Sequence, residues 1–365
     1  MKRRILALIL TAVMCLSLAA CGGSGGTNST PASSNPAAGA EGTAPSDGSS
    51  GGGTPEYICK FGSVVSTSHP AYALMEAAKK EIETNSNGRI EVQLYPSSQL
   101  GGEREMYEGM IFGTIEMFYG GSPTLSSFTN AITFQDLPFL FNNRAASFDF
   151  FKMYGDELAA DINSELGLSV WWTDNGEFSP LCNWEINTIA DFANLKIRVH
   201  EMEVMIKGLQ TIGAQPVAMA FPEIYTGLQQ GTINGNNATL LTAHTSKFYE
   251  LCKVYNQMCL FYDMGLTCVA TEWLESLPPD LQEVMRTAAQ NFSSNYNETY
   301  EDELAKSAKW LVEEGGMTVN TYTAAELASF KEAVQPCYDW YRETYGSEKL
   351  DKYLASIDEI NAKYA

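Results

Sequence analysis

The chain has 365 residues, in which 44 acidic side chains outnumber 23 basic ones and give a formal charge of −21. An acidic protein repels a phosphate backbone, which excludes nucleic acid as the expected partner. Beyond the N-terminal segment, no apolar run reaches the length of about 20 residues that a membrane-spanning helix needs.

The first 20 residues are typical of a secretory signal peptide. Three basic residues at positions 2–4 precede an apolar run from 5 to 18, and small residues then lead to Cys21. The run Leu-Ala-Ala-Cys at 18–21 resembles a bacterial lipobox, so we expect Cys21 to be acylated and to anchor the protein to a membrane. The alternative is ordinary signal cleavage, in which Cys21 has no role. Loss of the three cations would change the formal charge from −21 to −24.

Residues 21–55 are predicted to form a flexible tether. From 22 to 55 the chain consists of Gly, Ser, Thr, Ala, Pro and Asn apart from Glu41 and Asp47, so no large apolar residue offsets the entropy of ordering. The remaining residues, about 310, are enough for two domains of ordinary size. We therefore expect an extracytoplasmic protein, lipid-anchored to the cell membrane, whose soluble body is held near the membrane surface.

Strands and helices are predicted to alternate through the first part of the body. The residue pattern predicts strands over 57–63, 89–95, 115–119 and 168–172. Helical spacing of apolar residues predicts a helix from Tyr72 to a stop at Asn87 and Gly88, and another over 103–113. This order is typical of an α/β fold with helices on the faces of a parallel sheet.

The segment 194–243 contains the most informative residue, Arg198. At 195–200 apolar residues alternate with cationic or imidazole ones, the pattern of a strand with one buried face, so Arg198 should point away from the core. We predict a strand, strand, helix, strand unit, with a second extended run over 213–219 and a helix from Pro222 to a cap at Gly231.

Arg198 is a candidate ligand for an anion. In an open α/β sheet, ligands bind beyond the carboxyl ends of the strands, where a guanidinium can face a crevice. Arginine suits a carboxylate there, because its planar group forms two parallel charge-assisted hydrogen bonds and keeps its proton. The alternative is a surface arginine in a weak salt bridge.

Two helices are predicted in the C-terminal part, a long one from about Pro279 to Glu313 and a closing one over 322–345. The chain has no nucleophile elbow, phosphate loop, nucleotide fingerprint or metal-ligand spacing, so we expect no enzyme activity, cofactor or metal. Six cysteines of the body form no Cys-x-x-Cys pair, and their pairing stays open; they are Cys59, Cys182, Cys252, Cys259, Cys268 and Cys337. Cys252 and Cys259 are seven apart and could share one helix face.

Several runs of this sequence resemble the solute-binding proteins of tripartite ATP-independent periplasmic (TRAP) transporters, the family that includes dicarboxylate and sialic acid binders. The resemblance extends over almost all of the chain from Tyr57 onward. Its runs are FGSVVSTSHP at 61–70, NGRIEVQLYPSSQLGGERE at 87–105, GTIEM at 113–117, DLPFLF at 136–141, LKIRV at 195–199, IGAQPVAMAFPEIYTGLQQGTINGNN at 212–237, SKFYELCKVY at 246–255 and SLPPDLQEVMRTAA at 276–289.

The resemblance implies a two-lobed, periplasmic-binding-protein-like α/β fold with a long helix shared by both lobes. The chain would cross between the lobes near 173–176, return near Gly265 and cross again in the helix that starts about Pro279. The first lobe would comprise 56–175 plus about 264–303, and the second 176–263 plus about 304–365. A shared helix would act as a stiff spring for a hinge that a ligand closes.

The resemblance also assigns a binding site. Arg198 occupies the carboxylate-binding position, Phe221 the position of an aromatic that packs on the ligand, and His69 lies in a loop that borders the cleft. Asn237 is the best candidate for a neutral hydrogen bond to the ligand. Glu201 is ambiguous, because it could pair with Arg198 or recognise an amine on the ligand.

Other positions depart from the family pattern. Phe178 replaces a second arginine, the pattern DGQEN becomes NGNNA at 234–238, and polar residues of the first lobe become Val64 and Gly121. A buried polar ligand group without a partner costs about 1–3 kcal/mol, so the ligand should carry one carboxylate and an apolar or aromatic body, such as a keto acid or an arylalkanoate. Aromatic side chains would form its walls: Tyr119, Trp171 or Trp172, Phe178 and Phe221.

The resulting hypothesis is a lipid-anchored receptor that captures an organic acid outside the membrane and passes it to a TRAP membrane permease. One alternative is a sensor subunit that binds the same ligand and docks to a signalling receptor. A surface hydrolase is a second alternative, and it would need a nucleophile with an adjacent base.

Overall fold

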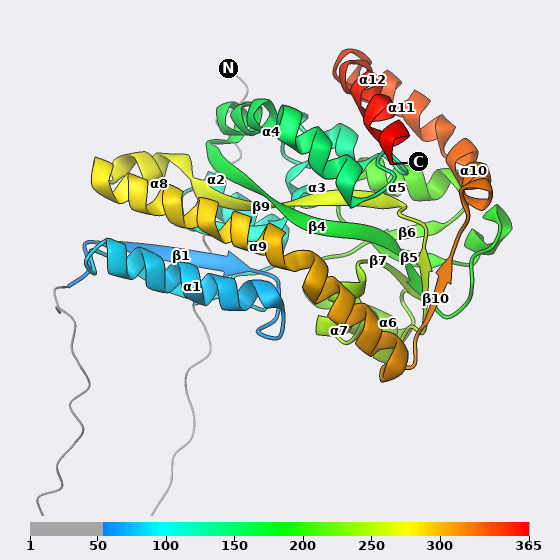
Figure 1. Ribbon diagram of the computed structural model, residues 1–365, viewed down its shortest axis with the longest axis horizontal. Helices are drawn as coiled ribbons and strands as arrows, with labels where there is room; N and C mark the ends of the chain where they lie inside the picture. Colours follow the sequence, from blue (N-terminus) through cyan, green and yellow to red (C-terminus); the bar gives the residue numbers. More distant parts are fainter. Residues whose placement is uncertain (1–53, 365) are drawn as a thin grey trace, which may run out of the picture. The chain divides into compact units, whose positions relative to one another are not determined.

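Residues 54–364 are described by the computed structural model of the protein (Figure 1). The predicted signal peptide, Cys21 and the tether up to residue 53 lie outside the described residues. The described residues form a mixed ten-stranded sheet in the order β2-β1-β3-β9-β4-β7-β5-β6, with β8 pairing both β4 and β10. None of the helices in this part of the chain combines the length and the apolar character that a membrane span requires.

The predicted elements of the first part are confirmed. Three parallel strands, with β1 in the centre, alternate with two helices: β1 (Tyr57–Ser63), α1 (Pro70–Asn85), β2 (Ile90–Tyr95), α2 (Glu103–Ile111) and β3 (Met117–Gly121). We call these elements the first lobe. Pro70 sits at the start of α1, where its missing N–H is tolerated.

Two long strands join the first lobe to the rest of the sheet. The first, β4 (Leu168–Cys182), runs antiparallel to β9 (Phe261–Ala270) and then pairs with β7 and β8. The strand is longer than the predicted 168–172, because pairing on both sides overrides the turn signals of its Gly and Pro residues. A bulge interrupts the pairing at Gly176, which has φ +93°, and a Cβ there would lie 1.9 Å from Tyr300 Oη.

The second lobe contains β5 to β8 with their helices. Its elements are β5 (Lys196–Val199), α5 (Glu203–Thr211), β6 (Gln215–Ala218), α6 (Ile224–Gln230), β7 (Gly235–Ala238), α7 (Leu240–Thr245) and β8 (Val254–Gln257). The predicted strand, strand, helix, strand order was wrong, because α5 lies between the first two strands and buries Val204, Met205 and Leu209. The predicted cap at Gly231 is confirmed by its left-handed conformation.

The long helix α9 (Pro279–Glu313) is shared by both lobes, as predicted (Figure 1). Its first half packs beside α1 and buries Met285, Phe292 and Tyr296 against the first lobe. Near its end, Leu311 packs with Leu181 and Phe248 in the core of the second lobe. One rigid element therefore contacts both lobes.

The predicted single closing helix over 322–345 is wrong. The chain instead forms β10 (Thr318–Thr321) and then three helices: α10 (Ala324–Ala333), α11 (Gln335–Tyr345) and α12 (Glu348–Lys363). The break falls at Val334, two residues before Pro336, whose ring cannot continue a helix interior. In Figure 1, α12 packs on α4 (Arg144–Leu166), a helix that the sequence analysis did not predict.

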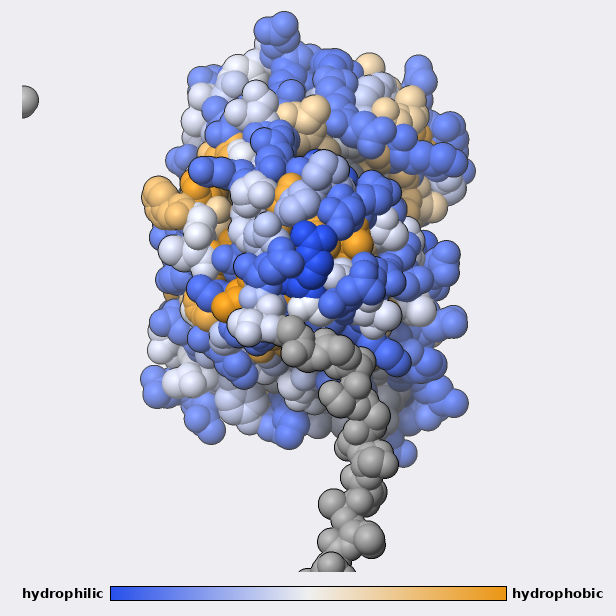
Figure 2. Space-filling view, turned by 90° about the vertical axis from the view of Figure 1, so that its left-hand side faces the viewer, coloured by the Kyte–Doolittle hydropathy of each residue, from blue (hydrophilic) through white to orange (hydrophobic). Residues whose placement is uncertain are grey.

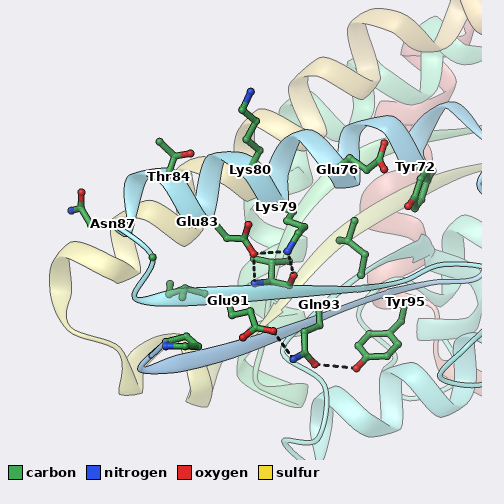
Figure 3. Close-up of a pocket in the computed structure, with 15 residues that line it drawn as sticks. Tyr72, Glu76, Lys79, Lys80, Glu83, Thr84, Asn87, Glu91, Gln93 and Tyr95 are labelled. Atoms are coloured by element: carbon green, nitrogen blue, oxygen red, sulfur yellow. Dashed lines mark hydrogen bonds and ion pairs between the residues drawn. The ribbon is translucent and has the colours of Figure 1, made fainter. Parts of the chain in front are cut away.

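Side chains of α1 and its cap cover part of the outer edge of the sheet at β2 (Figure 3). Ser86 Oγ accepts from the Ile90 N–H at 3.2 Å, and Glu83 Oε1 accepts from the Val92 N–H at 3.0 Å. Lys79 donates to both Glu83 and the Val92 carbonyl. These side chains occupy backbone groups that would otherwise be open to a further strand.

The face shown in Figure 2 is mostly hydrophilic, with apolar side chains scattered among polar ones. Scattered apolar residues are normal on a protein surface and mark no docking site. The high acidic content of the chain agrees with this distribution.

Candidate ligand-binding site

A cavity lies between the two lobes, and six of the eight binding residues predicted from the sequence line it. Its volume is about 600 Å³ including the space at its mouth. It is lined by Val64, Val65, His69, Glu103, Tyr119, Gly120, Gly121, Asn175, Phe178, Arg198, His200, Phe221, Asn236, Asn237, Ala238, Thr242 and Ser246. Both apolar walls and polar groups therefore face the same space.

Arg198 lies on β5 and faces this cavity. It is only 3% exposed, and its neighbours Ile197 and Val199 are buried as well, so β5 has no solvent-exposed face here and Arg198 is not a surface residue. Its Nε donates to the Met219 carbonyl at 2.9 Å. Burial lowers the pKa of Arg198 to about 10, against the opposing effect of nearby carboxylates, so the guanidinium stays charged at neutral pH.

Glu103 is the most important lining residue that the sequence analysis missed. It is the first residue of α2, where an acidic side chain stabilises the helix through the helix dipole. This local role already explains an acid at position 103, so nothing in the sequence indicated that Glu103 also faces the cavity. Its Oε1 accepts from the Gly121 N–H at 3.0 Å and its Oε2 from the Thr124 hydroxyl at 2.7 Å. Burial raises the pKa of Glu103, while these hydrogen bonds and the charge of Arg198 act in the opposite direction.

His69 lines the cavity as a neutral side chain. It caps α1, and its Nδ1 accepts from the Ala71 N–H at 3.2 Å, which assigns the ring proton to Nε2. Burial lowers the pKa of His69 to about 4. The ring stacks on Tyr296, with centroids 6.3 Å apart. His69 is thus a hydrogen-bond donor that carries no charge.

The aromatic walls were predicted in part. Tyr119, Phe178 and Phe221 line the cavity. Neither predicted tryptophan lines this cavity: Trp172 donates from Nε1 to the Gly155 carbonyl at 2.9 Å, and Trp171 packs against the core beside α9. Both faces of β4 are covered by helices, so the alternation of its residues could not show which position reaches the cavity.

Three buried polar side chains of the cavity have unused hydrogen-bonding atoms. Among the described residues, no partner reaches Asn236 Oδ1, either amide atom of Asn237, or His200 Nδ1. Asn237 was predicted as a ligand contact, whereas Asn236 and His200 were not. A buried polar atom without a partner costs about 1–3 kcal/mol, which a polar ligand would relieve.

Glu201 takes a position that the sequence did not suggest. Its Oε2 lies 3.6 Å from Nε of Arg104 on α2, so its ion pair is with Arg104 and not with Arg198. It lines a smaller neighbouring cavity that Glu103 and Arg198 also line. Glu201 therefore stands outside the main cavity.

Within residues 54–364, no group of three or more His, Cys, Asp or Glu side chains is arranged to hold a metal ion. All six described cysteines are free and buried. Cys252 and Cys259 do not share a helix face, because neither lies in an α-helix. Burial raises the pKa of Cys252 to about 12 and that of Cys182 to about 11, so these thiols are protonated at neutral pH.

The chain is similar to known proteins over most of its length. The family model of bacterial extracellular solute-binding proteins, family 7, matches residues 61–344. The C4-dicarboxylate-binding periplasmic protein DctP of Vibrio cholerae is 27% identical over 315 residues, which cover 82% of this chain and 91% of DctP.

Two solved structures are similar in fold and in sequence. A TRAP periplasmic solute-binding protein from Polaromonas sp. JS666, bound to D-erythronate, is 28% identical with a TM-score of 0.76 and covers 83% of this chain and 98% of its own. A TRAP protein from Xanthobacter autotrophicus Py2 with bound β-D-galacturonate is 26% identical, with a TM-score of 0.75 and coverage of 82% and 98%.

Proposed function

The chain belongs to the bacterial extracellular solute-binding proteins of family 7, and from this membership we propose that it captures an acid with one carboxylate and delivers it, unaltered, to a membrane permease. Proteins of this TRAP family bind organic acids and act outside the cytoplasm. Membership of this family supports a binding role.

The proposal rests on one observation: Arg198 is buried and charged and has no carboxylate partner among the described residues. Its charged side chain is buried in the cavity, and among the described residues no carboxylate lies within 4.0 Å of it as a salt-bridge partner. Burying an unpaired charge is costly, so an anion from outside the chain is the natural partner. A ligand carboxylate fits the two parallel hydrogen bonds that a guanidinium offers.

The other residues that line the cavity indicate which chemical groups the rest of the ligand carries. Tyr119, Phe178 and Phe221 offer apolar surface, which supports an apolar or partly apolar body. Asn237 and Glu103 support one or more hydroxyl or keto groups on that body, and the negative charge of Glu103 disfavours a second carboxylate. The relatives that bind D-erythronate and galacturonate have ligands with one carboxylate and several hydroxyls.

The location of the protein is a further part of the proposal. Acylation of Cys21 would anchor the body, and residues 21–55 would serve as a tether of ample reach. The lobes are proposed to comprise 56–175 plus about 264–303, and 176–263 plus about 304–365. The permease would then receive the ligand at the membrane surface.

The test is thermal unfolding with a panel of acids that contains keto, hydroxy and arylalkanoic monocarboxylates beside dicarboxylates. A ligand at 100 times its Kd stabilises the folded state by about 2.7 kcal/mol, which raises Tm. Arg198→Ala should abolish this shift and leave the unliganded fold intact, whereas Lys196→Ala, an exposed cation on the same strand, should retain it. Equal binding by Arg198→Ala would contradict the assignment.

A further inference from the structure

Arg104 and Glu201 form an ion pair between the two lobes. Arg104 belongs to α2 of the first lobe, and Glu201 follows β5 of the second. Arg104 Nε and Glu201 Oε2 are 3.6 Å apart, and each side chain is a little more than one-third exposed. The pair therefore lies where solvent reaches the boundary between the lobes.

Arg104 is held in place by its own lobe. Its Nη2 donates to Ser127 Oγ at 3.1 Å, its Nη1 lies 3.8 Å from Glu108 Oε1, and its guanidinium lies over the ring of Phe128 at 5.1 Å. These contacts fix the side chain before it meets Glu201. The ion pair across the boundary then costs little additional side-chain entropy.

Glu201 connects this ion pair to the ligand site. It lines a small hollow together with Arg104 and Arg198. Its charge raises the pKa of Arg198, so Glu201 acts electrostatically on both cations. The lobes are also close at this point, because a Cβ on Gly102 would lie 3.5 Å from the Cβ of Ala220.

A second contact between the lobes borders the main cavity. Ser66 Oγ, in the loop after β1, donates to the Thr245 carbonyl at the end of α7 at 3.4 Å. This bond is long and neutral, whereas the Arg104–Glu201 pair is charged and pre-positioned. Opening a hinge along α9 would have to separate both contacts, and separating the charged one also works against the Coulomb attraction of an exposed ion pair.

We propose that Arg104 and Glu201 form a latch that keeps the lobes closed over a bound acid, so that they set its residence time without touching it. The inference rests on the proposed function, because it takes the ligand to bind in the adjacent cavity. Release requires opening, opening breaks the ion pair, and the pair therefore acts on the dissociation rate. Because the pair is exposed, salt weakens it.

The test is the dissociation rate of a bound monocarboxylic acid by stopped-flow fluorescence. Arg104→Gln and Glu201→Gln should each raise this rate by about two- to fivefold, the range that an exposed ion pair supports, and leave association nearly unchanged. The double variant should dissociate no faster than either single one, and Arg104→Lys should restore most of the retention. Glu105→Gln, at an exposed position on the same helix, is the matched control and should behave like the parent.

Added salt should accelerate release from the parent and leave the two Gln variants unchanged. The latch is overturned if Glu201→Gln speeds release and Arg104→Gln does not, because Glu201 would then act through Arg198 or the ligand alone. It is also overturned if the two single effects add in the double variant.

Failure of the proposed function would be recognised separately. If the parent binds no acid of the panel, that function fails, and the latch is then tested in the unliganded protein by the distance between spin labels at the exposed positions Lys80 on α1 and Gln210 on α5. Arg104→Gln should lengthen or broaden this distance distribution. An unchanged distribution contradicts the latch.

Discussion

Glu103 of α2 and Arg198 of β5 line the same cavity from opposite lobes, and each alters the ionisation of the other. The charge of Arg198 lowers the pKa of Glu103, and the charge of Glu103 raises the pKa of Arg198. The site thus offers one cation for a carboxylate and one anion that accepts hydrogen bonds. A ligand with a carboxylate and a nearby hydroxyl satisfies both.

Glu103→Gln should change the selectivity of the site. The substitution keeps the shape of the side chain and removes the charge, so a hydroxy monocarboxylate loses a charge-assisted hydrogen bond and binds about tenfold more weakly. Succinate, which the Glu103 charge repels, should bind more tightly than to the parent. Isothermal titration measures both, and Glu105→Gln, an exposed neighbour on α2, should alter neither. An equal loss for both ligands would show that Glu103 supports the fold and not the selectivity.

Two buried carboxyl groups should make the stability of the protein depend on pH. Asp136, and Asp263 on β9, are fully buried. No hydrogen-bond partner from the described residues reaches the carboxylate oxygens of either side chain. Burial raises the pKa of Asp136 to about 8, and burial together with Asp136 raises that of Asp263. In the unfolded chain both groups titrate near pH 4.

The folded protein therefore holds protons that the unfolded chain has released, and this stabilisation is lost as the pH rises through about 8. Asp136→Asn should flatten the decline in the free energy of unfolding between pH 7 and 8 by up to about 1.4 kcal/mol per pH unit. Urea unfolding at several pH values measures the slope. Parallel curves for the variant and the parent would mean that Asp136 is ionised in the folded state.

Glu83→Ala should open the edge of the sheet at β2. The variant loses the acceptor of the Val92 N–H and the ion-pair partner of Lys79, so the edge backbone becomes free to pair with another chain. Light scattering should report more dimers and higher species at high protein concentration. Lys80→Ala, an exposed substitution on the same helix, should scatter like the parent. A Glu83→Ala protein with the association behaviour of the parent would show that the edge is closed by other means.

The sequence predicted the strands and helices whose apolar residues recur with a clear strand or helix period. Strands β1, β2 and β5, helices α1 and α2 and the shared helix α9 appear close to their expected bounds. Helix α4 was missed, and the break at Val334 was overlooked although Pro336 signals it. The length of β4 depends on β7, β8 and β9, which are distant in sequence, so local patterns could not reveal it.

The sequence predicted those residues of the candidate site that have no sufficient local explanation in a strand or a helix. Arg198, Phe221 and Asn237 were singled out with the help of the family resemblance, and all three line the cavity. Glu103 was missed because an acid at a helix start has a sufficient local explanation. The partner of Glu201 could not be inferred, since only the folded lobes bring Arg104 next to it.

The most direct test of the central claim compares an acid that binds with its neutral carboxamide, for both the parent protein and Arg198→Ala, by isothermal titration. If the carboxylate is bound by Arg198, the parent should lose affinity for the carboxamide by about tenfold to a hundredfold, while Arg198→Ala should bind both ligands equally weakly. A variant that still prefers the acid by the same factor as the parent would contradict the account.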